Sequence, residues 1–138
     1  MNTKETITTR VLVIGSIKSS GAKRRQRIRI SGFWLKDFGF TEGTLVTGEF
    51  GEGRATFKAA GDGIEAYSKV VSDIRKNGGQ TTQVKGSIHN KKMTPHFEVS
   101  GLWLSRYGFN TGDVIVICCR PGLIEAVRLD IPDARGFR

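Results

Sequence analysis

Apolar and polar residues follow the same order twice along the chain, so that Ser31 aligns with Ser100 and Val46 with Ile115. Residues 31–46 read SGFWLKDFGFTEGTLV, and residues 100–115 read SGLWLSRYGFNTGDVI, without a gap between the two segments. In both segments a Trp-Leu pair is followed, four residues after the tryptophan, by an aromatic residue, and this spacing places the side chains on one face of a helix. The length of the repeat indicates a tandem duplication.

The repeated segment is typical of a short helix with defined ends. Ser31 and Ser100 precede its apolar residues, where a side-chain oxygen can accept a hydrogen bond from the first free amides, so we expect both to be N-caps. Gly39 and Gly108 follow the aromatic residue, where a Schellman ending needs a left-handed residue. A capped helical turn is therefore predicted in each copy.

Alternating and β-branched segments flank this turn in both copies. The run at 11–17 corresponds to 83–88, because Gly-Ser-Ile occurs at 15–17 and again at 86–88. One strand is expected before the turn, and after it a glycine-containing hairpin joins two more. The first copy places these strands at 28–31, 44–50 and 54–57, and the second places them at 97–100, 113–119 and 123–127.

One segment between the copies has no counterpart. Residues 64–76 have apolar side chains at positions 64, 67, 70, 71 and 74, a helical spacing with one polar face. We expect a helix that bridges repeat one, at about 11–57, and repeat two, at about 83–127. Because a unit of half this chain is marginally stable alone, residues 1–138 are expected to form a single pseudo-symmetric domain with an irregular tail at 128–138.

The charge balance of the chain indicates the kind of partner that the protein binds. The chain of 138 residues carries a formal net charge of +9 with a pI near 10.0. That balance favours a polyanionic partner, most simply nucleic acid, ahead of an anionic membrane surface or an acidic protein. No apolar run approaches the ~20 residues that cross a bilayer, so we expect no membrane partner. The expected location is the cytoplasm, where the protein could associate with the nucleoid.

Cofactor and metal chemistry find little support in the sequence. Cys118 and Cys119 are adjacent, and neighbours on a strand point to opposite faces, so neither a zinc site nor a disulfide is expected. Cys119 aligns with Phe50, which predicts a thiol in the core. Gly15 and Gly21 form neither G-x-G-x-x-G nor G-x-x-x-x-G-K-[ST], the glycine-rich motifs that bind nucleotides, so no cofactor is expected.

Two basic loops occupy equivalent places in the two copies. The first holds six cations without an acidic residue, and the second holds three lysines and two histidines before Glu98. A charge run can be a solvated loop, but two such loops related by a two-fold arrangement favour phosphate binding, because each neutralised phosphate releases counterions. The predicted nucleic-acid-binding residues are Lys18, Lys23, Arg24, Arg25, Arg27, Arg29, Lys85, Lys91 and Lys92.

Catalysis is the alternative for the second loop. His89 and His96 are the two histidines of the chain, and with nearby lysines and Glu98 they could act as acid and base in RNA transesterification. Only one repeat carries them, and loop histidines among lysines are more often phosphate or base contacts. They remain weak catalytic candidates for an endoribonuclease. Trp34 and Trp103 could stack on bases, although their place beside the helix end favours a core role.

The repeated pattern resembles the SymE-like toxin family of the SpoVT/AbrB-like swapped-hairpin superfamily, which also holds MazE-type antitoxins. The resemblance covers about residues 11–57 and 83–127. It rests on Gly32, Trp34, Leu35, Gly39, Phe40, Gly43 and Val46, and on Gly101, Trp103, Leu104, Gly108, Phe109, Gly112 and Ile115.

The resemblance implies a β-rich α+β fold, in which two interleaved ββαβ units form one AbrB-like swapped-hairpin barrel. Most relatives build that barrel from two chains, whereas here the repeat supplies both halves as an intrachain pseudo-dimer, so a monomer suffices. Relatives bind DNA or RNA through a basic face. We therefore expect a nucleic-acid-binding protein, with two alternatives: an RNA-cleaving toxin, and a non-enzymatic inhibitor or interaction protein that docks its basic loops in an acidic groove of a protein partner.

Overall fold

The computed structural model describes residues 8–18, 24–61, 63–77, 80–89 and 91–129. The chain is β-rich, and its strands form two antiparallel sheets. In chain order the elements are β1 (Thr8–Val13), β2 (Gly15–Lys18), β3 (Arg24–Ser31), the 3-10 helix η1 (Phe33–Phe38), β4 (Leu45–Gly51), β5 (Arg54–Gly61), α1 (Gly63–Asn77), β6 (Gln80–Gln83), β7 (Lys85–His89), β8 (Lys92–Ser100), the 3-10 helix η2 (Leu102–Tyr107), β9 (Val114–Arg120) and β10 (Leu123–Arg128).

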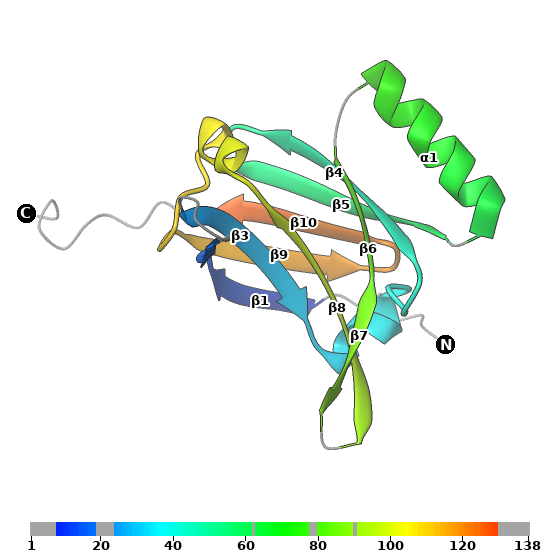
Figure 1. Cartoon of the computed structure of the whole chain (residues 1–138). Coiled ribbons are helices and arrows are strands. Elements are labelled where there is room, and N and C mark those ends of the chain that lie inside the picture. Colours follow the sequence, from blue (N-terminus) through cyan, green and yellow to red (C-terminus); the bar gives the residue numbers. More distant parts are fainter. Residues whose placement is uncertain (1–7, 19–23, 62, 78–79, 90, 130–138) are drawn as a thin grey trace, which may run out of the picture.

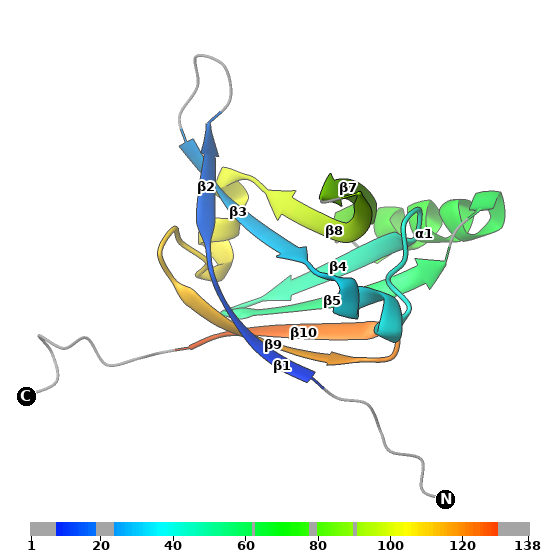
Figure 2. The same ribbon diagram turned by 90° about the horizontal axis from the view of Figure 1, so that it is seen from below.

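The two sheets face each other across the core (Figures 1 and 2). The larger has the order β1-β9-β10-β5-β4-β6, and the smaller has the order β2-β3-β8-β7. Each strand of the first repeat has an equivalent in the second: β1 and β6, β2 and β7, β3 and β8, β4 and β9, and β5 and β10. Replacing every strand by its equivalent gives the same two orders, read from the opposite end. The first repeat contributes β1 to β9 of the second, and the second contributes β6 to β4 of the first. Each repeat therefore completes the sheet of the other.

Hydrogen bonds at the corners follow the same exchange. The Gly32 amide donates to the Pro95 carbonyl at 3.1 Å, and the equivalent Gly101 amide donates to the Gln26 carbonyl at 2.9 Å. Within the larger sheet β5 pairs with β10, and within the smaller sheet β3 pairs with β8. The central strand pair of each sheet thus joins one repeat to the other.

The first strand of each repeat is divided at a buried residue. Ile14 and Val84 are each 1% exposed, and at these points the chain leaves the larger sheet and enters the smaller one. Leu12 pairs with Ile115 as Thr82 pairs with Val46, so Leu12 is equivalent to Thr82, and Gly15 to Lys85. The prediction of one continuous strand at 11–17 is wrong, and so is the alignment of the two Gly-Ser-Ile segments, because burial of the dividing residue sets the register.

The start of each short helix also differs from the prediction. Gly32 and Gly101 are the N-caps, without a side-chain cap hydrogen bond. Ser31 and Ser100 are the last residues of β3 and β8, so their prediction as N-caps is wrong. The sharp corner from strand to helix explains this outcome: Gly32 has φ 145°, and a Cβ there would overlap the indole of Trp34.

The ends of the short helices agree with the prediction. Gly39 and Gly108 are left-handed, with φ 89° and 86°. The Phe40 amide donates to the Leu35 carbonyl at 3.0 Å, and the Gly39 amide donates to the Lys36 carbonyl at 3.2 Å, which is the Schellman pattern. The predicted ending is confirmed.

The core draws on both repeats. Phe40, Phe57, Phe97 and Phe109 are at most 2% exposed, and the Phe57 and Phe97 rings meet edge to face at 5.4 Å. Cys119 is buried as predicted, and this burial, with the charge of the neighbouring cysteine as a smaller cause, raises its pKa to about 11. Both tryptophans are partly buried against this core, which confirms their core role.

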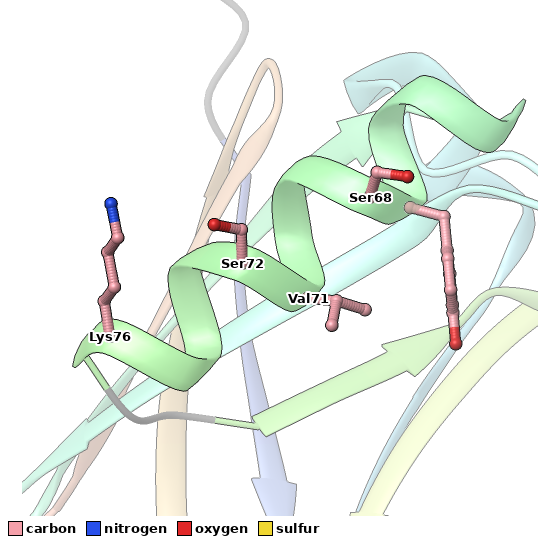
Figure 3. Close-up of a pocket in the computed structure, with 5 residues that line it drawn as sticks. Ser68, Val71, Ser72 and Lys76 are labelled. Carbon is pink, nitrogen blue, oxygen red and sulfur yellow. The ribbon is translucent and has the colours of Figure 1, made fainter.

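Helix α1 confirms the predicted bridging helix at 64–76. It contacts β4, β5 and β6, so it covers one half of the outer side of the larger sheet (Figure 1). Val70 is its buried anchor, at 4% exposed. Along its side runs an open groove of about 450 Å³, lined by Tyr67, Ser68, Val71, Ser72 and Lys76 (Figure 3). In the part of the chain that the structure describes, no helix is both long and apolar enough to span a membrane.

Candidate nucleic-acid interface

The arginine-rich segment lies on a strand, and this placement sorts its side chains. β3 begins at Arg24, so the predicted strand at 28–31 starts four residues earlier, and the prediction that Arg24, Arg25 and Arg27 belong to a loop is wrong. Because successive side chains of a strand point to opposite faces, burial of Ile28 and Ile30 in the core turns Arg25, Arg27 and Arg29 outward. Three guanidinium groups therefore line the outer face of the smaller sheet.

Strands β7 and β8 extend this outer face with residues from the second repeat. β8 places Glu98 beside Arg29 and His96 beside Ser31, and β7 places Lys85 beside His96. We call the outward side chains of the four strands the basic face. Its cations are Arg25, Arg27, Arg29, Lys85 and Lys92, its described carboxylate is Glu98, and its uncharged polar members are Ser31, Ser87, Thr94, His96 and Ser100.

Glu98 lies at the centre of the basic face and orients two arginines. Its Oε1 is 3.8 Å from Arg27 Nη1 and 3.7 Å from Arg29 Nη1. The side chains of this trio are 32–40% exposed, so water screens the attraction and its net contribution is small. Arg25 Nε donates to Ser100 Oγ at 3.5 Å. One carboxylate shared by two arginines leaves the basic face strongly positive.

A shallow pocket of about 200 Å³ opens on the second-repeat side of the basic face. It is lined by Arg29, Ser31, Ser87, Thr94 and His96. Ser87 Oγ and His96 Nδ1 are 3.2 Å apart. A guanidinium, three hydroxyls and an imidazole give this pocket the donors that bind anionic oxygens.

The imidazole in this pocket is held neutral near pH 7. Burial is the main cause that lowers the pKa of His96 from its ordinary 6.5, and the positive charge of Arg29 acts in the same direction. The carboxylate of Glu98 opposes the shift. His96 can therefore donate or accept one hydrogen bond at neutral pH, and it gains a positive charge only in acid.

The described ends of the two β-hairpins, at Arg24 and at Lys92, lie at opposite ends of the smaller sheet, because β3 and β8 are antiparallel. Arg24 stands three residues before Arg27, which pairs with Ser100, and Lys92 stands eight residues before Ser100. At ~3.3 Å per residue the two ends are at most about 36 Å apart. Both ends belong to one sheet, and the basic face runs between them.

Other predicted residues lie elsewhere. Lys18 pairs with Arg24 on the opposite face of the sheet, where Arg24 Nε donates to Ser16 Oγ at 2.9 Å. Lys91 occupies the turn before β8, with φ 65°. Lys23 lies outside the described residues. His89 ends β7, and its side chain also lies outside the described part.

Sequence reasoning missed the hydroxyl groups of the pocket. Ser31, Ser87 and Thr94 were not among the predicted site residues, although all three face outward beside cations. The signal that could have found them is the alternation of 92–100 around buried Phe97 and Val99, once it is combined with the pairing of β7.

Comparison of the chain with protein-family models, with curated proteins and with solved structures gives no match. Among the residues that the structure describes, no group of three or more His, Cys, Asp or Glu side chains is placed to hold a metal ion.

Proposed function

We propose that the protein binds nucleic acid through the basic face. The observation that carries this proposal is the row formed by Arg25, Arg27 and Arg29, joined by Lys85 and Lys92, around the single described carboxylate of that face. Neutralising phosphates with such side chains releases counterions, which supplies most of the affinity of non-specific nucleic-acid binding.

The row is held in place before a ligand arrives. Arg25, Arg27 and Arg29 project from a strand whose alternate residues are fixed in the core, and Glu98 and Ser100 orient their guanidinium groups. Side chains on a rigid strand lose less freedom on binding than side chains on a loop. Arginine also offers several donors in a planar fork that suits phosphate oxygens.

We further propose that the architecture is an AbrB-like swapped-hairpin barrel formed by one chain as a pseudo-dimer, and that residues 1–138 act as a single domain. The palindromic strand orders and the exchange of β1 and β6 between repeats support this proposal. So does the core cluster, which takes residues from both repeats. The SymE-like resemblance then implies a cytoplasmic DNA- or RNA-binding protein.

The shape of the basic face suits a duplex or a folded RNA. Its two hairpin ends are at most about 36 Å apart, so the face is no longer than about one turn of duplex DNA, which is about 34 Å. Cations between the ends would follow the phosphates of one strand, and those at the ends would contact the flanking backbone. Both DNA and RNA present phosphates in this way.

The test compares two variants with equal loss of charge. The face variant carries Arg25→Gln, Arg27→Gln and Arg29→Gln, and we expect it to bind duplex DNA and structured RNA at least about 30-fold more weakly at ~100 mM salt. The control variant carries Arg54→Gln, Lys58→Gln and Arg120→Gln, three exposed positions in the larger sheet. We expect it to lose much less affinity.

Gel-shift titrations and fluorescence anisotropy would measure both variants. Equal losses in the two variants would contradict binding through the basic face. If the wild-type protein does not bind nucleic acid but forms a stable complex with an acidic protein, the result would favour the alternative function as a non-enzymatic inhibitor. Denaturing gels of the same RNA samples would reveal cleavage, and turnover removed by His96→Ala would favour the endoribonuclease.

A further inference from the structure

The shallow pocket on the second-repeat side of the basic face differs from the rest of that face in its side chains. It is lined by Arg29, Ser31, Ser87, Thr94 and His96, and we call it the hydroxyl pocket. β7 is an edge strand of the smaller sheet, and β3, which carries the three arginines of the row, ends at Ser31. The arginine row therefore stops at the hydroxyl pocket, and the pocket reaches the edge of the sheet.

Strand pairing brings the side chains of the hydroxyl pocket together. Ser31 on β3 is directly opposite His96 on β8, and Thr94 on β8 is directly opposite Ser87 on β7. Directly opposite side chains of an antiparallel pair share a face, with Cβ atoms ~5 Å apart. Arg29 stands two residues before Ser31 on the same face and borders the same opening. Because three of the lining side chains are small, a space of about 200 Å³ remains between them.

Several donors of the hydroxyl pocket can bond to a ligand. No hydrogen bond joins the hydroxyl of Ser31 or Thr94 to another residue in the described part of the chain. Arg29 Nη1 is 3.7 Å from Glu98 Oε1, beyond the usual hydrogen-bond range of ~2.7–3.2 Å. The guanidinium group can therefore turn donors to an anion in the pocket.

Ser87 and His96 add one further donor. Ser87 Oγ is 3.2 Å from His96 Nδ1, and either atom can supply the hydrogen between them. If Nδ1 donates, the hydroxyl keeps its own proton for a ligand, and if the hydroxyl donates, the proton of the neutral ring is on Nε2. Each arrangement leaves one donor of the pair unused within the protein.

The duplication supplies an internal reference for these positions. Ser87 pairs with Thr94, and the matched pair of the first repeat is Ile17 with Arg25. Arg25 Nε donates to Ser100 Oγ at 3.5 Å, so this guanidinium group has a partner within the protein. The same strands thus accept an aliphatic and a charged side chain at these positions. The sheet does not require the two hydroxyls of the second repeat, which indicates that they serve binding.

We infer that the hydroxyl pocket binds the terminal phosphate of a nucleic acid, a phosphate monoester, while the arginine row contacts the adjoining backbone. This inference rests on the proposed function. Near pH 7 a monoester carries a charge of about −1.5 to −2 and three oxygens outside the ester bond, whereas an internal diester carries one charge and two such oxygens. A guanidinium group, hydroxyls and an imidazole around one opening suit the monoester better.

The volume of the hydroxyl pocket limits the size of its ligand. About 200 Å³ is below the ~300–1,000 Å³ of sites that enclose a drug-sized ligand. A phosphate group fits this space, whereas the sugar and base attached to it extend beyond the pocket. Recognition should therefore depend on the terminal phosphate and not on the identity of the terminal base.

Anisotropy titrations with duplex DNA of about 12 base pairs, just over one turn, test the inference. The probes are identical except at one end, which carries a 5′-phosphate, a 3′-phosphate or a hydroxyl. We expect the wild type to bind a phosphorylated probe at least about 10-fold more tightly than the hydroxyl probe, because charge-assisted hydrogen bonds are added. A gain for either phosphorylated probe supports the inference, and comparison of the two identifies the end that is bound.

Two pocket variants keep the net charge of the protein. Ser87→Ile introduces the residue of the matched position in the first repeat, and Thr94→Val keeps the shape of the side chain without its hydroxyl. Each should reduce the preference for the phosphorylated probe to less than about 3-fold. The control is Thr9→Ile, which replaces an exposed hydroxyl on β1, an edge strand of the larger sheet. It should keep the wild-type preference.

Far-UV circular dichroism confirms that each variant is folded. Equal affinity of the wild type for the phosphorylated and hydroxyl probes would overturn the inference and leave the proposed function standing. A preference that persists in both pocket variants would overturn it as well. If the wild type binds none of the three probes, the proposed function and the inference fail together.

Discussion

The two repeats have the same backbone arrangement and differ in the side chains that it carries. Gly39 and Gly108 end equivalent helices with nearly the same φ angle, and Leu35 and Leu104 are both fully buried. On the basic face the matched residues diverge: Arg27 of the first repeat corresponds to His96 of the second. Matched corners and core hold the architecture, and unmatched surfaces are where its two halves can acquire different functions.

The core shows a second difference: in one pair of matched positions, the small and the large side chain are exchanged between the repeats. The first repeat combines Gly48 with Phe57, and the second combines Ile117 with Ala126 at the matched positions. A Cβ at Gly48 would meet Phe57 at 3.2 Å and Phe50 at 3.1 Å, so the glycine leaves room for the rings. The duplicated core is complementary across the two halves, although its residues are not identical.

The largest expected effect concerns the matched corners. Gly32→Ala and Gly101→Ala should each lower the free energy of unfolding by about 3 kcal/mol or more, because a Cβ overlaps the neighbouring indole and φ is positive at both positions. Gly15→Ala is the control, since nothing lies within 4 Å of its Cβ and its φ is ordinary. Urea titration followed by circular dichroism measures all three. A marginal effect at either corner would show that the corners are not equivalent.

The second effect concerns the volume exchange. Gly48→Ile, which introduces the residue of the matched position, should cost about 2–3 kcal/mol through overpacking against the two phenylalanines. Phe57→Ala alone should cost about 3–5 kcal/mol by leaving a cavity. The double variant should lose clearly less than the sum, because it restores the Ile-Ala combination of the other repeat. Additive losses in urea titrations would show that the two positions do not share space.

The sequence predicted those features that depend on local pattern. The repeat itself, the left-handed glycines and the bridging helix all follow from spacing along the chain. The change of sheet at Ile14 did not, because a buried residue within an apolar run looks like any other residue of a strand. The placement of Ser31 in β3 likewise depends on its pairing with His96, which joins residues far apart in the sequence.

The candidate site shows the same limit. Arginines at 24, 25, 27 and 29 form one run in sequence, but the strand turns Arg24 to one face and the others to the opposite face. The neighbours of Arg29, including Ser87 and Thr94, come from the second repeat and become visible only through the register of β8.

A smaller effect, on the pH dependence of nucleic-acid affinity, distinguishes His96 from Arg27 on the basic face. Because the pKa of His96 lies below 6.5, its side chain is neutral at pH 7.5, and His96→Gln should change nucleic-acid affinity less than about 2-fold there. Arg27→Gln should weaken binding about 5-fold at any pH. As the pH falls below the lowered pKa of His96, protonation of its side chain should strengthen wild-type binding, and His96→Gln should remove this gain. Anisotropy titrations at pH 5.5 and 7.5 would measure it, and a pH-independent wild type would contradict it.

The same shift predicts a weak pH dependence of stability. A histidine whose pKa is lowered by folding is protonated more readily in the unfolded chain, so proton uptake favours unfolding as the pH falls through 6.5. The wild type should therefore lose slightly more stability than His96→Gln between pH 7.5 and 5.5. Thermal melts at both pH values would detect this difference, and its absence would contradict the direction assigned to His96.

The salt dependence of nucleic-acid affinity tests binding through the basic face most directly. Five phosphate contacts predict that log K falls with log salt at a slope of about −4.5 for duplex DNA. The face variant, without its three arginines, should show a slope of about −2. The control variant at Arg54, Lys58 and Arg120 should keep the wild-type slope. Equal slopes for the face variant and the wild type would contradict binding through the basic face.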